Sequence, residues 1–191
     1  GLFVSPINTD TGLGIVTISF ALAIGQFVWG AVQPIAGAIA DRYGPGRVLA
    51  GGIVLLAIGS ALTPFMTSSF GIVVSMGVLT AMGAGACSFS VLIGAVSHFV
   101  PPAHRGTASG VINAGSSFGQ FVFAPTLQAV ASAAGWVVAV QTLAAITLLA
   151  LPAAWVLRGT PQPAAAGAAP RQTTRDAVAT ALRDPSYRLL A

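Results

Sequence analysis

The sequence predicts an all-α membrane protein, a bundle of five transmembrane helices. The mean hydropathy is +0.86 and 6% of the residues are charged, whereas about 25% are charged in an ordinary soluble domain. Moreover, residues 11–40, 48–104 and 106–157 contain no Asp, Glu, Lys or Arg. A helix that crosses a bilayer needs about 20 mostly apolar residues, and a charge at its centre costs about 2.5 kcal/mol or more. The three uncharged runs therefore have room for one, two and two spans.

The uncharged runs and the turn signals between them place each span. The first connection is the charged, glycine-rich stretch Gly37-Ala-Ile-Ala-Asp-Arg-Tyr-Gly-Pro-Gly-Arg47, which predicts a tight hairpin at the membrane surface. In this hairpin Gly44 and Gly46 allow the positive φ that a tight turn requires. Residues 64–69 and 131–135 predict the second and fourth connections. In order along the chain, we expect the spans at 14–36, 48–67, 70–97, 106–130 and 135–157.

The arginines predict the orientation in the membrane. Arg42 and Arg47 lie in the first connection, Arg105 lies in the third, and the second and fourth connections have no arginine. Positive residues mark the cytoplasmic side, so the N-terminus is expected outside and the C-terminus in the cytoplasm. The remaining arginines, all after the last span, agree with this: Arg158, Arg171, Arg175, Arg183 and Arg188. We expect a multi-pass protein of the inner or plasma membrane, with the lipid bilayer as partner and no nucleic-acid partner.

The composition divides the chain into three parts. Residues 1–157 form the predicted transmembrane part, and Gly1–Val4 is expected to be the tail of an upstream first helix. Residues 158–176 are rich in Pro, Ala and Arg, which is typical of a flexible cytoplasmic linker. Residues 177–191 are expected to begin a second half, with a short amphipathic helix followed by the start of another span.

Uncharged polar residues form stripes on two predicted helices. On the helix at 106–130, Ser109, Ser116, Ser117 and Gln120 fall within about 60° of Asn113, and Ser19, Gln26, Gly30 and Gln33 share a face of the first span. Such residues either hydrogen-bond between helices, at about 0.6 kcal/mol each, or line a polar pathway. The candidate translocation path consists of Gln26, Gln33, Asn113, Ser117 and Gln120.

Glycines predict the close helix contacts. Gly115 and Gly119 form a G-x-x-x-G surface away from the polar stripe of the 106–130 helix, and such a surface lets two helices approach closely. The span at 70–97 contains Gly77, Gly83, Gly85 and Gly94, which suit close packing or local bending.

The residues of an enzyme site are missing from the predicted spans. These spans have no paired acids, no metal-ligand spacing of His and Cys, no phosphate-binding loop and no nucleophile beside a base. Intramembrane enzymes need ionisable groups at membrane depth, and Cys87 is the single candidate there, expected to be a packing residue. We therefore expect no enzyme activity, no cofactor and no metal.

The first connection resembles the G-x-L-A-D-R-x-G-x-R-x signature of the major facilitator superfamily. Two longer stretches resemble its monocarboxylate-transporter and oxalate/formate-antiporter branch. One begins Val78-Leu-Thr-Ala-Met-Gly83-Ala-Gly85 and continues from Ser97 to Gly110. The other is Asn113-Ala-Gly115-Ser-Ser-Phe-Gly119-Gln120, followed by Gly135-Trp136. The resemblance implies helices two to six of a 12-helix transporter, whose first helix and C-terminal half are absent from this sequence.

The resemblance also implies a function. Members of this superfamily are secondary active transporters that alternate the access of a central site. Gly37, Asp41, Arg42, Gly44 and Arg47 match the superfamily's gate loop, whose aspartate caps a helix terminus and pairs with basic partners while the cytoplasmic side is closed. The implied substrate is a small organic anion such as a monocarboxylate, carried with a proton or by exchange.

Two departures from the resemblance leave alternatives open. Leu79 stands where the superfamily often has an arginine, and Val137 follows Gly135-Trp136 where many relatives have an arginine. A facilitator-type exporter of drugs or other solutes is the nearest alternative. A non-transporting membrane scaffold and an inert truncated fragment are the others.

Overall fold

The described part of the chain belongs to one compact unit. In the computed structural model, residues 4–97 and 100–157 are described. The chain divides into units of residues 1–161 and 162–191, and every described residue lies in the first. The linker predicted at 158–176 and the second half predicted from residue 177 therefore fall outside the described residues.

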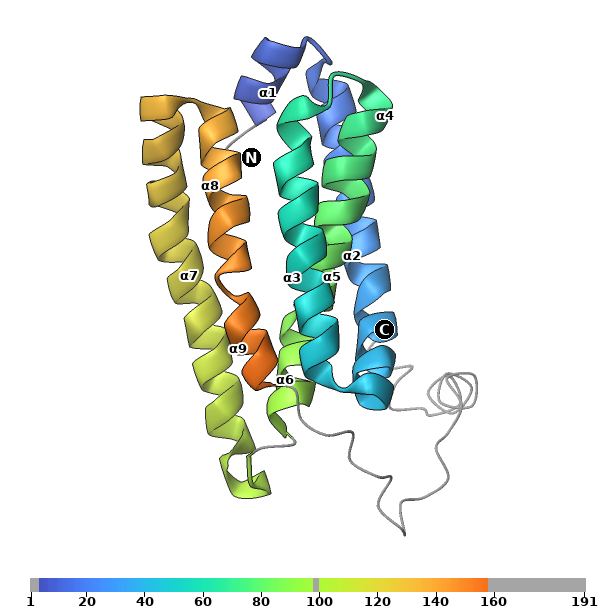
Figure 1. Ribbon diagram of the computed structural model, residues 1–191, viewed down its shortest axis with the longest axis vertical. Coiled ribbons are helices and arrows are strands. Elements are labelled where there is room, and N and C mark those ends of the chain that lie inside the picture. Colours follow the sequence, from blue (N-terminus) through green and yellow to red (C-terminus); the bar gives the residue numbers. More distant parts are fainter. Residues whose placement is uncertain (1–3, 98–99, 158–191) are drawn as a thin grey trace, which may run out of the picture. The chain divides into compact units, whose positions relative to one another are not determined.

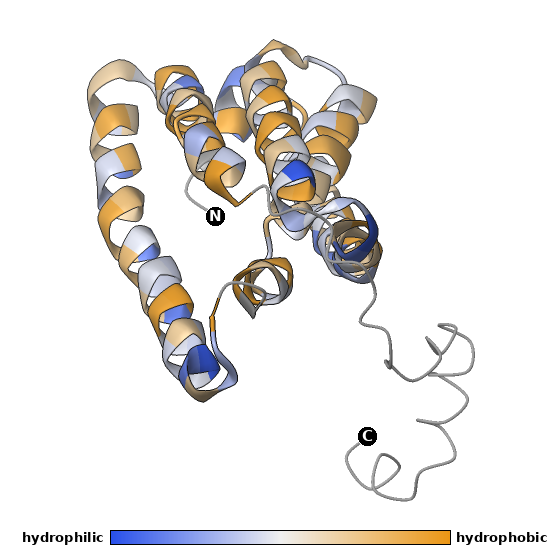
Figure 2. Cartoon of the chain, turned by 60° about the horizontal axis from the view of Figure 1, so that its bottom comes forward, coloured by the Kyte–Doolittle hydropathy of each residue, from blue (hydrophilic) through white to orange (hydrophobic). Residues whose placement is uncertain are grey.

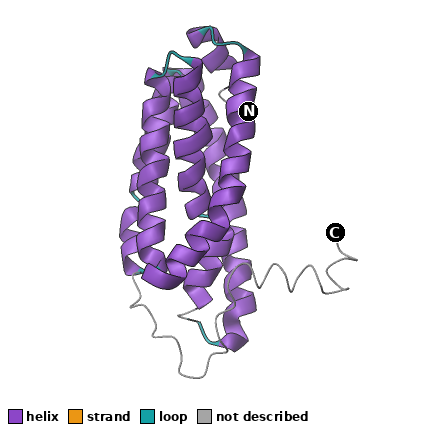
Figure 3. Ribbon diagram, turned by 90° about the vertical axis from the view of Figure 1, so that its right-hand side faces the viewer, coloured by secondary structure: helices purple, strands orange, loops and turns teal. Residues whose placement is uncertain are grey.

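The described residues form helices joined by short connections, and the long helices run side by side (Figure 1, Figure 3). Two of the short elements, η1 and η3, are 3-10 helices, and η2 is a π-helix. In chain order the elements are α1 (Val4–Thr11), α2 (Ile15–Tyr43), α3 (Pro45–Leu62), η1 (Thr63–Phe65), α4 (Ser69–Ile72), η2 (Val73–Thr80), α5 (Ala81–Ala86), α6 (Phe89–Ser97), η3 (Pro102–His104), α7 (Arg105–Ala134), α8 (Trp136–Leu148) and α9 (Leu151–Val156).

Four of the five predicted spans coincide with helical stretches that are both long and apolar enough to cross a membrane. These stretches are Ile15–Tyr43, Pro45–Phe65, Ser69–Val96 and Trp136–Val156. The fifth predicted span corresponds to α7, which has 30 residues and so extends about 45 Å at 1.5 Å per residue. It is long enough to cross but less apolar than the other four, because the polar stripe interrupts its apolar residues. The all-α membrane bundle predicted from the sequence is confirmed.

The connection between α2 and α3 is shorter than the sequence predicted. The hairpin expected over residues 37–47 is helical except at Gly44, which has φ 92° and ψ 138°. Gly44 takes this conformation at no steric cost because it has no Cβ, and Pro45 then opens α3 with the fixed φ that suits a first helical turn. Gly46 lies within α3 and has no positive φ, so of the two glycines that allow this conformation Gly44 alone adopts it.

The two ends of the bundle differ in charge. The Gly44 end holds Asp41, Arg42, Arg47 and Arg105, and hydrophilic (blue) segments are visible at this end in Figure 2. At the Gly135 end, where α8 begins and α1 lies, Asp10 carries the one charge among the described residues. The arginines of the first and third connections therefore share one end of the bundle, as their sequence positions predicted.

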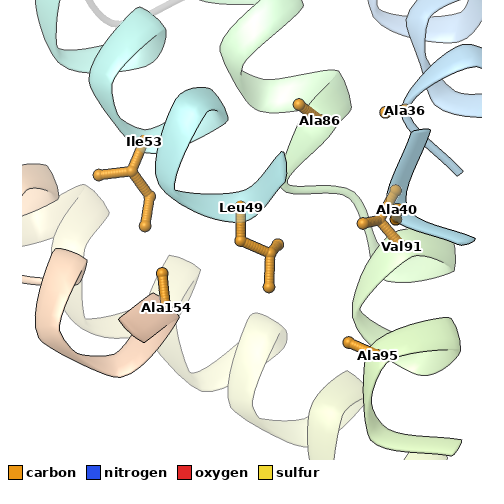
Figure 4. Close-up of a cluster of buried hydrophobic side chains, with 8 residues drawn as sticks. All are labelled: Ala36, Ala40, Leu49, Ile53, Ala86, Val91, Ala95 and Ala154. Carbon is orange, nitrogen blue, oxygen red and sulfur yellow. The ribbon is translucent and has the colours of Figure 1, made fainter. Parts of the chain in front are cut away.

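The core lies around α3, which packs against α2, α5, η2 and α8. Towards the Gly44 end, small and branched apolar side chains from α2, α3, α5, α6 and α9 meet in one cluster (Figure 4). Its buried members are Ala36, Ala40, Leu49, Ile53, Ala86, Val91, Ala95 and Ala154. Five of these eight residues are alanine, so the helix axes approach closely there.

The stretch at 70–97 is helical but not one continuous α-helix. It begins as α4, continues through the π-helix η2 and returns to α-geometry in α5. At Cys87 the backbone turns to φ −96° and ψ 17°, and α6 starts at Phe89. The local bending predicted from the glycines of this span is thus present, although Gly94 lies beyond the break.

Candidate translocation path and gate

Apart from Gly44, the gate residues lie on helices rather than on a loop. Gly37 is inside α2, and Asp41 and Arg42 are in its last turn. Arg47 is in the first turn of α3. The guanidinium carbon of Arg42 lies 5.4 Å from the centre of the Tyr43 ring, a cation–π contact worth about 0.5–1 kcal/mol when exposed. The single Gly44 residue therefore brings the gate charges together at one end of two helices.

Asp41 does not cap a helix within the described residues. It is exposed, and α3 begins without any side-chain cap, since Gly44 occupies the cap position. A negative charge in the last turn of α2 faces the negative end of the helix dipole, which is unfavourable. The fold of the described chain thus gains no stability from this carboxylate.

The polar stripe of α2 meets the break in the third predicted span. Ser90, in the first turn of α6, donates a hydrogen bond of 3.2 Å to the Gln33 side-chain oxygen. The hydroxyls of Ser88 and Ser90 lie 3.0 Å apart. Ser88 is buried and Gln33 is half-buried, whereas Gln26 is exposed further along α2. Of the candidate path residues of α2, Gln33 therefore belongs to a polar cluster at the helix break.

The polar stripe of α7 is uncovered from Asn113 onward, whereas Ser109 at its beginning is half-buried. Asn113, Ser117 and Gln120 are exposed, and between residues 113 and 126 every position except the half-buried Gly119 is exposed. The helix packs on α6 near the Gly44 end and on α8. The stripes of α2 and α7 are not brought together, because α2 packs on η2, α5 and α3 instead.

Gly115 and Gly119 meet no neighbouring helix in the described residues. A Cβ added to either glycine would have nothing within 4 Å, because the middle of α7 lies away from the other described helices. Their predicted contact with another helix stays a prediction.

The close helix contacts are made instead by glycines of the third span and of α3. A Cβ on Gly83 would lie 2.6 Å from the Gly52 carbonyl oxygen, and one on Gly85 would lie 2.8 Å from the Trp29 carbonyl oxygen. A Cβ on Gly77 would lie 2.9 Å from the Ala21 carbonyl oxygen. These backbones touch because neither partner has a side chain in between. The packing predicted for these three glycines is confirmed.

Sequence reasoning missed two links between distant segments. Gln141 of α8 donates a hydrogen bond of 3.0 Å from its side-chain nitrogen to the carbonyl oxygen of Ala61. The indole N–H of Trp136 donates to the carboxylate of Asp10. Asp10 was recognisable as the isolated acid before the first span, but no pattern in the chain points to a partner 126 residues away.

A cleft between α6 and α7 opens near the Gly44 end. Its lining is mostly apolar and consists of Ile93, Val96, Arg105, Ala108, Ser109 and Ile112. Ser109 thus faces α6, at the foot of the polar stripe on α7.

Comparisons with known proteins agree with this arrangement. The sequence profile of the Major Facilitator Superfamily matches residues 1–190. A probable sulfoacetate transporter of Cupriavidus necator is 31% identical over 140 residues, which is 73% of this chain and 31% of that protein. The fujikurins efflux protein of Gibberella fujikuroi is 28% identical over 165 residues, 86% of this chain and 34% of that protein.

Monocarboxylate transporter 13 of Rattus norvegicus is 29% identical over 131 residues, 69% of this chain and 30% of that protein. The chain therefore spans about a third of the length of these relatives. Because the superfamily profile covers almost every residue, and the helices and the Gly44 turn follow its signature, the chain belongs to the major facilitator superfamily.

Proposed function

We propose that this chain is part of a secondary active transporter that works by alternating access, and that it has no enzyme activity. The observation that carries the proposal is the uncovered polar stripe of α7. In a bilayer, polar groups at membrane depth face protein or a water-filled cavity rather than lipid. Asn113, Ser117 and Gln120 lie near the middle of a helix long enough to cross, so they suit the wall of a polar path.

The proposed substrate is a small organic anion such as a monocarboxylate, carried by proton symport or by exchange. Relatives named for sulfoacetate and for monocarboxylates support this class. Amide and hydroxyl groups of the path residues can donate hydrogen bonds to carboxylate or sulfonate oxygens. The rest of the transporter, including its second half, would supply the remaining contacts and the coupling.

A facilitator-type exporter of larger, less polar solutes is the second candidate. One relative is named as an efflux protein for fujikurins. The aromatic side chains on the same region of α7 favour this candidate, because Phe118 and Phe121 are 68% and 77% exposed beside the polar stripe.

Uptake into liposomes decides between the two candidates. The full-length protein would be reconstituted and offered radiolabelled lactate, acetate or sulfoacetate, with and without a pH gradient, and with and without unlabelled substrate inside. A hydrophobic dye serves as the second class of substrate. Uptake of an acid driven by the gradient or by exchange supports the proposal, whereas transport of the dye alone supports the exporter.

Substitutions on α7 test the path. Gln120→Ala and Asn113→Ala are each expected to lower the initial uptake rate roughly tenfold, because one hydrogen bond to substrate is worth about 1.4 kcal/mol. The amount of protein in the membrane should stay close to wild type, since both side chains are exposed in the described fold. Initial rates would be normalised to protein amount by quantitative immunoblot.

Thr126→Ala is the matched control on the same helix. The Thr126 hydroxyl already donates to the carbonyl oxygen of Val122 at 2.7 Å, so its removal should leave uptake unchanged. If Gln120→Ala and Asn113→Ala lose protein and uptake in equal proportion, the stripe holds helices together and the path proposal fails.

The orientation is also a proposal. We expect Ser68 and Ser132 to face outside, and Arg47, His104 and Gln172 to face the cytoplasm with the C-terminus, because positive residues mark that side. Single cysteines at these positions, in a Cys87→Ser background, would be treated in intact cells with a membrane-impermeant thiol reagent. Labelling at position 104 or 172 from outside would reverse the assignment.

A further inference from the structure

The helix that carries the candidate path is attached mainly near its ends. At the Gly44 end, α7 meets α6 across the cleft that Ala108 and Ile112 line. At the Gly135 end, Leu127 is the one buried residue of α7 among those the structure describes. Between these attachments the helix is exposed, so its direction depends on how the two ends are held.

The attachment at the Gly135 end passes through one residue. Helix α7 ends at Ala134, and Gly135 has φ 89° and donates its N–H to the carbonyl oxygen of Ala131 at 3.0 Å. Helix α8 begins at once with Trp136. Because consecutive Cα atoms are about 3.8 Å apart, a connection of one residue has no slack. The position of Trp136 therefore determines where the C-terminal end of α7 lies.

Trp136 is held by a polar and an apolar contact. Trp136 is 6% exposed and packs in a cluster with Ile7, Ile18, Ile72 and Val140. Its N–H donates to the carboxylate of Asp10 in α1. The other described charges, Asp41, Arg42, Arg47 and Arg105, lie at the opposite end of the bundle and do not compete for it.

We propose that Asp10 and Trp136 are positioning residues for α7, acting through their hydrogen bond. The bond fixes the first residue of α8, and Gly135 transmits that position to α7. The consequence for transport rests on the proposed function, because it requires that Asn113, Ser117 and Gln120 line the path. The consequence for the position of α7 does not.

A second contact holds α8 in the bundle independently of Asp10, so the effect of Asp10 on α7 can be distinguished from a general effect on folding. Gln141, five residues after Trp136, ties α8 to the carbonyl oxygen of Ala61 in α3, and Ala139, Val140 and Ala144 are buried. Helix α8 therefore stays in the bundle when the Asp10 contact is lost. The loss is expected to loosen the α7–α8 turn while the rest of the fold is kept.

The test measures the position of α7 directly in the full-length protein. Spin labels on cysteines at Phe121 of α7 and Phe70 of α4, which are 77% and 79% exposed, would report the distance by pulsed electron paramagnetic resonance in a Cys87→Ser background. A control pair at Phe27 of α2 and Phe70 does not involve α7. Asp10→Ala should broaden or shift the 121–70 distance distribution and leave the 27–70 distribution unchanged.

Conservative variants identify the hydrogen bond as the cause. Asp10→Asn keeps an oxygen that accepts the indole N–H, so it should restore the wild-type distances. Trp136→Phe keeps an apolar ring without the N–H and should reproduce Asp10→Ala. The double variant Asp10→Ala/Trp136→Phe should add nothing further, because both changes remove the same bond.

Uptake by the same variants gives the functional part. Asp10→Ala is expected to lower the uptake rate per molecule roughly fivefold, because losing one hydrogen bond changes the equilibrium between correctly placed and displaced α7 by about that factor. Asp10→Asn should stay close to wild type. Unchanged 121–70 distances in Asp10→Ala, or equal damage from Asp10→Asn, would overturn the inference. If the wild type transports none of the substrates offered, the proposed function fails while the distance measurements still decide the role of Asp10.

Discussion

Gly83→Ala is expected to lower the amount of folded protein about tenfold or more, because overpacking against a rigid backbone costs on the order of 3 kcal/mol. The added methyl group would touch the backbone nitrogen of Leu56, and it would lie 2.6 Å from the Gly52 carbonyl oxygen and 2.7 Å from the Leu56 Cα. All three atoms are backbone, so no side chain can rotate away to make room. The helices α3 and α5 would have to separate along their contact.

The measurement is the yield of monodisperse protein after detergent extraction, followed by size-exclusion chromatography of a fluorescent fusion. Gly51→Ala is the matched control, because Gly51 is an exposed glycine of α3 whose Cβ would meet nothing within 4 Å. It should keep the wild-type yield or raise it slightly, since alanine favours a helix over glycine. A Gly83→Ala variant with wild-type yield would show that the contact between α3 and α5 is looser than the structure has it.

Asp41→Asn is expected to lower transport several-fold while leaving the protein amount unchanged or slightly raised. Asp41 lies in the last turn of α2, where its charge opposes the helix dipole by about 0.3–1 kcal/mol. Removing that charge therefore does not destabilise the described fold. Asparagine also keeps the size and shape of the side chain.

The loss of transport follows from a bias between two states. We propose that the carboxylate of Asp41 approaches a helix terminus or basic partner elsewhere in the transporter while the cytoplasmic side is closed. Loss of about 1 kcal/mol shifts a two-state equilibrium about fivefold, which slows a cycle that must visit both states. Arg42 and Arg47 stay in place in this variant, so the orientation signal of the loop is kept.

Uptake rate, protein amount and cysteine accessibility would be measured together. A cysteine introduced at Gln120 should react faster with a thiol reagent in the Asp41→Asn background, as expected when the inward-open state gains population. Wild-type uptake together with unchanged accessibility would leave Asp41 as part of a loop that sets orientation, and the gating proposal would be withdrawn.

The sequence predicted the order and limits of the helices well because the membrane imposes a simple rule. The uncharged runs end where arginines and turn residues begin, and α2, α3, α7 and α8 start or stop within a few residues of those points. The extent of the Gly44 turn could not be predicted, because Asp41, Arg42 and Tyr43 are as compatible with a helix end as with a loop. The structure shows the helix continuing to Tyr43.

The glycine contacts were predicted in part. The glycines of the third span and the G-x-x-x-G pair Gly115 and Gly119 were equally good candidates for close helix packing. In the described chain Gly83 meets a neighbouring helix, whereas Gly115 and Gly119 do not. Gly52 and Gly59 were not singled out, although both lie against the third span. A glycine pattern on one helix indicates that another helix can approach closely. Which helix does so depends on how the rest of the bundle packs.

The hydrogen bonds between distant segments could not be predicted. Each of the pairs Asp10–Trp136, Gln141–Ala61 and Ser90–Gln33 joins residues far apart in sequence through one polar group. Periodicity identifies which face of a helix is polar, but it does not state which residue of another helix lies opposite. The polar face of each helix was therefore predictable, but the residue that it contacts on another helix was not.

The one-residue link at Gly44 has a mechanical consequence. A loop of several residues absorbs motion between the helices that it joins, whereas a single glycine between Tyr43 and Pro45 allows almost no sliding. Movement of the end of α2 is therefore transmitted to the first turn of α3, and the two helix ends move together about the Gly44 backbone. A displacement of the α2 end that carries Asp41 would therefore move the first turn of α3 with it.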